Sequence, residues 1–309
     1  MAVKESVAKD TLVTINRRSL KLTNLSKVYF PDEGITKGDV IAYYNTMADH
    51  ILPYLKDRPM SLKRNPNGIK DKGFYHKDAA EEGPTWIKSY DEFAESSQKV
   101  VNYIVCNDKA TLLYLANLGC IEMNPWNSTT RAPEKPTYLM IDIDPSDKNT
   151  FDQVVTVAQA VQEVLNRAGA ISYCKTSGAT GLHVYVPLNA RYSYEVAREF
   201  AHIVATLVQE QLPDLTSLER SLKKRGNKIY IDYLQNSKGQ TLASTYSLRP
   251  VPGASVSTPL AWKEVKTGLH PSQFTIFNIE KRVQKLGDLF YMVLKKGNNL
   301  RGCLKNLGY

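Results

Sequence analysis

The segment PTYLMIDIDPSD, residues 136–147, constrains the fold of this chain most, because it ends an apolar run with two aspartates. Side chains along a strand alternate between its faces, so Asp142 and Asp144 point to the same side, together with Met140. The opposite face is apolar and consists of Leu139, Ile141 and Ile143. Two ionised carboxylates at this spacing repel each other unless a cation or water lies between them. The segment therefore predicts a buried strand with a divalent-metal site; the alternative is that Asp144 only caps the next helix.

The residues after this strand predict a mixed α/β sheet. Helices are expected over two ranges, 150–168 and 193–212, the second ended by Pro213. Their inward faces are predicted to be Val154, Ala158, Val161 and Leu165 in the first helix and Val196, Phe200, Ile203 and Leu207 in the second. ISYCK and LHVYVPL, joined by the turn TSGATG, indicate a hairpin, and KIYIDYLQ alternates as a further strand. The order strand, helix, hairpin, helix, strand favours a sheet with helices on one side over a doubly wound one.

The N-terminal part indicates helices before the aspartate-bearing strand. Thr36 and Asp39 form a capping box, so a helix is expected to begin close to Lys37. One face of that helix is predicted to contain Val40, Tyr44, Met47 and Ile51. A second amphipathic stretch, residues 101–118, contains Leu112, Leu115 and Leu118. No internal repeat or low-complexity linker divides the chain. We therefore expect residues 1–309 to form a single domain, with an N-terminal α/β lobe over about 1–135 packed against a catalytic sheet over about 136–309.

The charge of the chain favours an anionic partner. Its 40 Lys and Arg outnumber its 31 Asp and Glu, which gives a formal net charge of +9. The excess is clustered in residues 56–77 and in RSLKKRGNK, residues 220–228, although each cluster is equally compatible with a solvated loop. The four cysteines form no CxxC pair, and neither a secretory h-region nor a long apolar window is present. These features predict a protein of the reducing cytoplasm.

A third carboxylate completes a candidate metal site. Asp232 lies inside the strand KIYIDYLQ, whose other face is Ile229, Ile231 and Tyr233. If this strand neighbours residues 138–144, three carboxylates converge on one face of the sheet. Such carboxylates, together with water and phosphate oxygens, form the hard-cation site of phosphoryl- and nucleotidyl-transfer enzymes. The alternative is that Asp232 pairs with a basic residue.

The turn between the two hairpin strands has the composition of a phosphate-binding loop. Gly178 and Gly181 allow backbone amides to converge on an anion. Hydroxyl and nitrogen donors around them are Lys175, Ser177, Thr180 and His183. Without the carboxylates, a plain hairpin loop with a structural histidine would explain the same residues. Arg249, in STYSLRP, is a further candidate for triphosphate binding, with a surface salt bridge as its alternative.

These residues together carry a resemblance. YLMIDIDP, KTSGATGLHVYVPL and IDYLQNSKGQTLASTYSLRPVPGASVSTPLAW resemble the polymerase domain of bacterial DNA ligase D and its stand-alone archaeal and bacterial relatives in the archaeo-eukaryotic primase superfamily. The similarity continues upstream through NLSKVYFP, TKGDVIAYY, RPMSLKR and GFYHKDA, from about residue 22 onward. The resemblance implies a primase-like fold and a template-dependent polymerase for non-homologous end joining, which favours ribonucleotides and uses Mn2+ or Mg2+.

The resemblance also implies roles for individual residues. Two divalent cations would be held by Asp142, Asp144 and Asp232. The incoming NTP or dNTP would be bound by Lys175, Ser177, Gly178, His183 and Arg249, with Phe74 stacking on the nucleobase or template. Lys27 and Lys37 would bind the 5′-phosphate of a downstream DNA end, although as residues alone they are ordinary surface lysines. Lys63 and Arg64 would line the same DNA-binding face.

Two positions depart from the pattern of the relatives. Many relatives have a basic residue where this chain has Thr180, so the grip on the triphosphate would depend more on Lys175 and Arg249. Relatives often have His-Pro-Trp where this chain has Asn124, Pro125 and Trp126. Asn124 keeps hydrogen bonding but cannot become cationic, which puts an acid or phosphate-binding role at this position in doubt.

The sequence thus predicts a stand-alone polymerase domain that acts on gapped, 5′-phosphorylated DNA at the nucleoid, with a separate DNA ligase and a Ku-like protein as partners. A glycosyltransferase is a rival, because an Asp-x-Asp after an apolar strand also binds a metal and a nucleotide sugar. The basic clusters and Asp232 argue against it. A DNA-end-binding scaffold without catalysis is a second rival, which the intact carboxylates disfavour.

Overall fold

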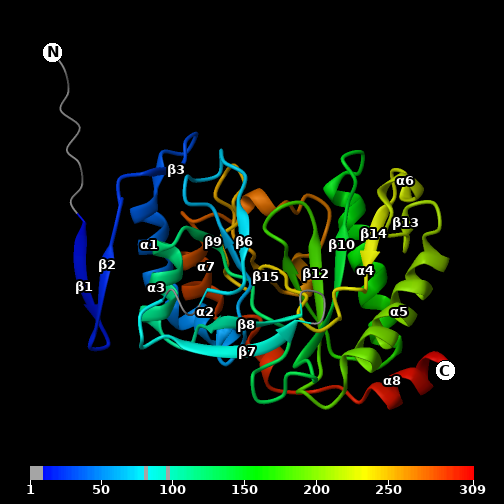
Figure 1. Ribbon diagram of the computed structural model, residues 1–309. Helices are drawn as coiled ribbons and strands as arrows, with labels where there is room; N and C mark the ends of the chain where they lie inside the picture. Colours follow the sequence, from blue (N-terminus) through cyan, green and yellow to red (C-terminus); the bar gives the residue numbers. More distant parts are fainter. Residues whose placement is uncertain (1–9, 80–82, 95–97) are drawn as a thin grey trace.

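The computed structural model describes residues 10–79, 83–94 and 98–309. The first nine residues, part of the segment in which no leader is expected, lie outside this range. The described chain is built around a six-stranded sheet with the strand order β13-β14-β10-β12-β11-β15, here called the central sheet (Figure 1). Its strands are β10 (Tyr138–Asp144), β11 (Tyr173–Thr176), β12 (Leu182–Pro187), β13 (Thr216–Ser217), β14 (Ile229–Asp232) and β15 (Pro259–Leu260). Only β13 and β14 pair in parallel, so the predicted mixed sheet is confirmed.

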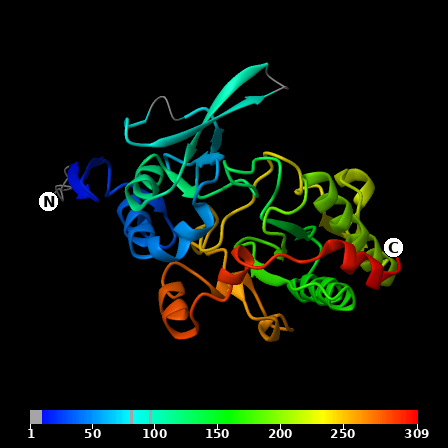
Figure 2. The ribbon, with the colours of Figure 1, turned by 90° about the horizontal axis from the view of Figure 1, so that it is seen from below.

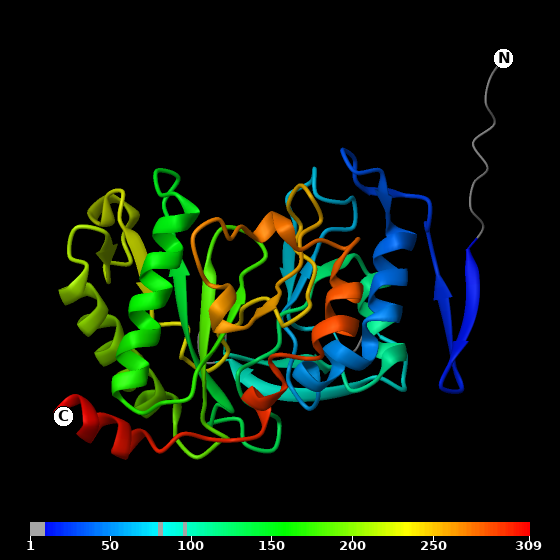
Figure 3. The same cartoon turned by 180° about the vertical axis from the view of Figure 1, so that it is seen from behind.

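Two long helices cover one face of the central sheet, α4 (Phe151–Arg167) and α5 (Tyr194–Gln211) (Figure 3). Thr150 and Gln153 form a capping box at the start of α4, and Ser193 caps α5. The apolar face of β10 packs into this layer, and its residues Leu139, Ile141 and Ile143 are fully buried. Because α4 and α5 take up this face, the face that carries Asp142 is left toward the N-terminal part of the chain.

The N-terminal part is a second layer of short elements (Figures 1 and 2). Its helices are α1 (Lys37–Thr46), α2 (Ala48–Leu55) and α3 (Lys109–Asn117). Its strands are β1 (Thr11–Ile15), β2 (Arg18–Leu22), β3 (Val28–Phe30), β4 (Ile35–Thr36), β5 (Leu62–Arg64), β6 (Phe74–His76), β7 (Lys88–Ala94), β8 (Lys99–Val105) and β9 (Cys120–Glu122). Strands β6, β5 and β9 form a three-stranded sheet in that order, and the hairpin of β7 and β8 projects from the body of the molecule in Figure 2.

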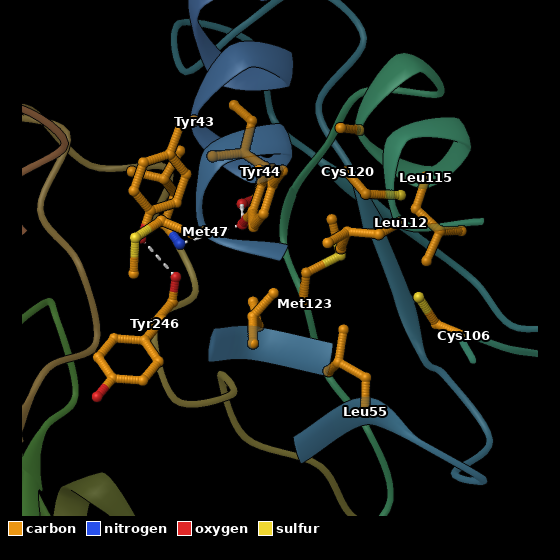
Figure 4. Packing of buried hydrophobic residues seen from close by; sticks show 14 of the residues in the cluster. Tyr43, Tyr44, Met47, Leu55, Cys106, Leu112, Leu115, Cys120, Met123 and Tyr246 are labelled. Carbon is orange, nitrogen blue, oxygen red and sulfur yellow. Dashed lines mark hydrogen bonds between the residues drawn. The ribbon is translucent and has the colours of Figure 1, made fainter. Parts of the chain in front are cut away.

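A second apolar core joins this layer to the C-terminal part of the chain. Figure 4 shows part of it, where the hydroxyl of Tyr43 donates to the carbonyl of Tyr246 over 2.7 Å. Met140 and Tyr185, from the central sheet, belong to the same core. The C-terminal elements are α6 (Leu222–Arg225), η1 (Trp262–Glu264), η2 (Pro271–Gln273), α7 (Ile279–Leu286), η3 (Tyr291–Leu294) and α8 (Leu300–Leu307). The division into a lobe over 1–135 and a sheet over 136–309 stays a prediction.

Three local predictions need correction. The helix expected through Ile51 is interrupted at Met47, where α1 ends and α2 begins, although the predicted face is buried. Residues 101–118 are helical only from Lys109, because the first residues belong to β8. The inward face of α5 was predicted only in part: Phe200 is buried as expected, but Val196 is 40% exposed, and Ala197, Ala201 and Ala205 are buried as well. Small side chains let α5 approach α4 closely, so the alanines share the buried face with Phe200 and Val204.

None of the helices in the described part of the chain combines the length and the apolar character that a bilayer crossing requires.

Candidate functional site

Four polar residues form one row across neighbouring strands of the central sheet. Asp142 on β10 lies directly opposite Asp232 on β14 and, on its other side, opposite His183 on β12. Lys175 on β11 lies opposite His183, which extends the row to a fourth strand. Residues directly opposite each other in antiparallel strands have β-carbons only about 5 Å apart on the same face. The prediction that the strand of Asp232 neighbours residues 138–144 is therefore confirmed.

Asp142 and Asp144 lie in an environment that disfavours negative charge. Burial and then the charges of Asp144 and Asp232 raise the pKa of Asp142 well above its usual range. Burial and the charge of Asp232 raise the pKa of Asp144 as well. Asp142 Oδ1 is buried and accepts no hydrogen bond, since His183 Nε2 lies 3.3 Å away without hydrogen-bond alignment. A divalent cation would relieve both the repulsion and the unpaired oxygen, so this donor set fits a metal ion.

The carboxylates do not converge on one point as they stand. Among the described residues, no three His, Cys, Asp or Glu side chains are gathered closely enough to hold an ion. Asp232 instead accepts hydrogen bonds from the amide of Leu234 over 2.8 Å and from Gln235 Nε2 over 3.0 Å. A metal ion bound by Asp232 would compete with these two donors for its oxygens.

Lys175 is held by the protein on all sides. Its side chain is fully buried, and its ammonium nitrogen lies 2.5 Å from Ser257 Oγ, 2.9 Å from the carbonyl of Ala243 and 2.9 Å from His183 Nδ1. Burial, with the charge of Arg249, lowers the pKa of Lys175 to about 7. Because an ammonium has three donors, these three contacts use all of them. In this structure Lys175 thus contacts His183 at Nδ1, the ring nitrogen that does not face Asp142.

His183 is a neutral imidazole. Burial and then the charges of Lys175 and Arg249 hold its pKa well below the usual value. Its Nδ1 accepts from Lys175, so the ring hydrogen is on Nε2, which faces Asp142. The row therefore presents one N–H donor beside the carboxylates.

The loop between β11 and β12 needs glycine at two positions. Gly178 has φ +76°, and a β-carbon there would lie 2.7 Å from Arg249 Cγ. A β-carbon on Gly181 would lie 2.2 Å from the carbonyl oxygen of Ile143. The amides of Ala179 and Gly181 converge on Ser177 Oγ, at 3.1 and 3.0 Å. The glycines thus bring the loop against both Arg249 and the aspartate-bearing strand.

Arg249 joins the loop to the N-terminal layer. Its Nη1 donates to the carbonyl of Ser177, and its Nε donates to Glu122 Oε2 over 2.8 Å. The alternative of a surface salt bridge does not describe this contact, because the Glu122 side chain is only 6% exposed. Glu122 also lies 3.9 Å from Lys63 Nζ. Sequence reasoning missed Glu122, which follows two apolar residues in a three-residue strand and lies 127 positions from its partner.

The proposed DNA-binding residues lie on the N-terminal layer. Arg64 lies over the exposed ring of Phe74, with its guanidinium carbon 5.4 Å from the ring centroid. Lys63 lies beside Arg64 on β5, in the same sheet as Phe74. Arg58 does not belong to a surface cluster, because it is buried and donates to the carbonyls of Trp126 and Asn127. Asn124 is also buried, and its Nδ2 has no hydrogen-bond partner, while Thr180 is exposed.

Lys27 and Lys37 lie together at the start of α1. The amide of Lys37 donates to the carbonyl of Lys27 over 2.8 Å. Lys37 Nζ donates to the carbonyl of Thr23 over 2.7 Å, and the exposed Lys27 donates to Asn67. Burial and then the charge of Lys27 lower the pKa of Lys37 to about 8. The predicted capping box of Thr36 and Asp39 is present at this helix end.

Comparison with known proteins identifies the family. The family described as "LigD, primase-polymerase domain" matches residues 36–290. The bifunctional non-homologous end joining protein LigD of Bacillus subtilis is 34% identical over 88% of this chain, and the multifunctional LigD of Mycolicibacterium smegmatis is 29% identical over 80%. These alignments span 44% and 32% of the two relatives, so the chain corresponds to less than half of their length.

A solved structure is similar throughout. The structure described as the polymerase domain from Mycobacterium tuberculosis ligase D in complex with DNA superposes with a TM-score of 0.83 and 28% identity. The match covers 90% of this chain and 99% of that one. The predicted family resemblance and the mixed α/β fold are therefore confirmed. This chain belongs to the LigD primase-polymerase domain family.

Proposed function

We propose that this chain is a template-dependent nucleotidyltransferase that adds NTPs or dNTPs to primer or break ends in gapped DNA during non-homologous end joining. The observation that carries the proposal is the row of Asp232, Asp142, His183 and Lys175 across four strands. It places carboxylates and an N–H donor side by side on the face of the sheet turned toward the N-terminal layer. Family membership supports the same reaction class.

Asp142, Asp144 and Asp232 are the residues that would hold two divalent cations, Mn2+ or Mg2+. When bound, such cations lower the pKa of a primer 3′-hydroxyl and stabilise charge on the pyrophosphate leaving group. The fit rests on the unpaired buried oxygen of Asp142 and on the mutual repulsion of the carboxylates. The chain itself contributes position, since β10 and β14 fix the spacing of Asp142 and Asp232 through their backbone register.

Arg249 and His183 are the principal groups for the incoming triphosphate. Both present N–H donors beside the carboxylates, and charge-assisted contacts to phosphate oxygens contribute on the order of 2 kcal/mol each. Ser177 and Gly178 shape the loop through which Arg249 approaches. Lys175 contributes by holding His183 in the tautomer that donates from Nε2. The exposed Thr180 adds no cation at this site, so Arg249 would contribute more of the triphosphate-binding energy.

The N-terminal layer is proposed to bind DNA. Lys27 and Lys37 would form the pocket for a downstream 5′-phosphate, because the two lysines lie together at the N-terminal end of α1, where the helix dipole favours an anion. Phe74 would stack on the template or nucleobase, and Lys63 and Arg64 would contact the backbone. The TM-score of 0.83 to a polymerase domain in complex with DNA supports this assignment.

We also propose that the whole chain, residues 1–309, acts as one catalytic domain at the nucleoid in the cytoplasm. A DNA ligase and a Ku-like end-binding protein would seal and hold the ends, because the similar LigD proteins are described as bifunctional or multifunctional end-joining proteins.

The test is nucleotide addition by the pure protein. A gapped duplex with a downstream 5′-phosphate is incubated with Mn2+ and each NTP or dNTP separately, and the primer products are resolved. We expect addition of the nucleotide that the template base specifies. Absence of addition with all eight nucleotides would refute the proposal in favour of a scaffold. A DNA-independent release of nucleoside diphosphate from a nucleotide sugar would instead identify a glycosyltransferase.

A further inference from the structure

Glu122 is a buried carboxylate to which neither the sequence nor the proposed reaction assigns a role. Its side chain is 6% exposed and lies at the end of β9, in the N-terminal layer. A buried carboxylate is costly unless cations or hydrogen bonds compensate it. Two cations approach one of its oxygens, Oε2, which accepts from Arg249 Nε over 2.8 Å and lies 3.9 Å from Lys63 Nζ.

The contact with Glu122 determines which edge of the Arg249 guanidinium is free. Nε is taken by Glu122, and Nη1 donates to the carbonyl of Ser177. Within the described part of the chain, Nη2 has no hydrogen-bond partner. Arg249 also influences the pKa values of Asp142, Lys175 and His183, so its charge lies close to the row across the sheet. Glu122 and the carbonyl of Ser177 therefore hold the planar guanidinium of Arg249 in place. Its Nη2 edge is left to bind an anion beside the carboxylates.

The orientation of the Arg249 guanidinium depends on Glu122. Gly178 packs against the arginine stem, where a β-carbon would lie 2.7 Å from Cγ, so the stem is fixed on one side by backbone. On the other side the carboxylate of Glu122 is the charged group that holds the head.

We propose that Glu122 is a positioning residue that aligns Arg249 for the triphosphate of the incoming nucleotide. The inference rests on the proposed function, because it takes Arg249 as a triphosphate ligand. Glu122 does not contact the nucleotide itself, so its effect on nucleotide affinity passes entirely through Arg249. This dependence separates positioning from a general structural contribution.

The test is a double-mutant cycle with a binding readout. Glu122→Gln keeps the shape and an acceptor but removes the charge, and Arg249→Met removes the guanidinium while keeping apolar volume. Affinity for a fluorescent α,β-methylene triphosphate, which cannot be transferred, is measured alongside the KM and kcat of primer extension. We expect Glu122→Gln to weaken nucleotide binding and raise KM about tenfold, with kcat changed less than threefold and DNA affinity within twofold. In the Arg249→Met background, Glu122→Gln should have no further effect.

A matched control is available in the pair of Glu264 and Arg282, which lie 2.6 Å apart in the C-terminal part of the chain. Glu264→Gln should leave nucleotide affinity unchanged. Unchanged affinity in a folded Glu122→Gln protein, or an equal loss in the Arg249→Met background, would overturn the proposal. If Glu122→Gln fails to fold, Glu122→Asp keeps the charge but withdraws it by one methylene, and the same cycle applies. If the wild-type chain binds the analogue but adds no nucleotide, the polymerase function is refuted. The affinities for the analogue in the double-mutant cycle would still test the role of Glu122.

Discussion

Replacing Gly181 by alanine should separate catalysis from DNA binding. The new β-carbon would lie 2.2 Å from the carbonyl oxygen of Ile143, and such contacts are essentially never found below 3.0 Å, so at least 0.8 Å of movement is required. Ile143 lies between Asp142 and Asp144, and Gly181 exchanges two hydrogen bonds with Ser177, at 2.9 and 3.0 Å. The movement therefore displaces the carboxylates from the triphosphate loop.

The magnitude follows from the size of that displacement. A misplacement of about 1 Å at a reacting centre costs about 100-fold in rate. Overpacking costs about 1–3 kcal/mol of stability. We expect kcat for single-nucleotide addition to fall about 100-fold, with DNA affinity within twofold and a Tm only a few degrees lower.

The control is Gly302→Ala in α8, where the nearest atom would be the flexible Asn299 Nδ2 at 3.2 Å. A helical Gly→Ala change of this kind gains about 0.5–1 kcal/mol. Its activity should equal that of the wild type. Wild-type kcat and Tm in Gly181→Ala would show that the loop and β10 are not in close contact, and the geometry of the site described above would be wrong.

Further predictions concern the two proposed phosphate sites. Arg249→Ala and His183→Ala should each raise the nucleotide KM about thirtyfold, for about 2 kcal/mol per contact, and leave DNA affinity unchanged; an unaltered KM in both would place the loop outside the site. Lys27→Ala with Lys37→Ala should weaken binding to gapped DNA with a 5′-phosphate about tenfold but barely affect a 5′-hydroxyl end, and equal losses at fixed salt would exclude a pocket. The preference for a 5′-phosphate should fall as pH rises from 7 to 9, because a pKa of about 8 takes Lys37 from about nine-tenths to about one-tenth charged. Lys37→Arg should remove this pH dependence, and a constant preference in the wild type would contradict it.

The sequence was sufficient to predict those features that depend on residues close together in the chain. Alternation with period two assigned Asp142 and Asp144 to one face, and the capping box of Thr36 and Asp39 defined the start of α1. The helix at 150–168 was also predictable, because its buried face of Val154, Ala158, Val161 and Leu165 follows a simple helical spacing. In each case the information lies within a few residues of chain.

The rest depended on contacts between distant segments. Strand pairing assigned Asp232 and His183 to opposite sides of Asp142, which no local pattern specifies. The pair of Glu122 and Arg249 joins residues 127 positions apart. The inward face of α5 was predicted from its large residues, and Phe200 is buried, but close packing against α4 also buries alanines that the prediction left out, while Val196 is exposed. Lys175 was expected to meet the triphosphate directly, and only the structure reveals the three protein acceptors around its ammonium group.

The most direct test of the central claim is the rate of first-nucleotide addition by Asp142→Asn beside the wild type, on gapped 5′-phosphorylated DNA with saturating Mn2+. The substitution keeps the shape of the side chain but removes one charge from the proposed metal site, whereas DNA binding depends on lysine and arginine contacts to phosphates. It also removes the buried charge and the repulsion by Asp144 and Asp232, which together raise the pKa of Asp142, so the metal-free variant should be at least as stable as the wild type. The account predicts templated addition by the wild type, a loss of at least about 1,000-fold in the variant and equal DNA affinity. Addition by Asp142→Asn at the wild-type rate would contradict it.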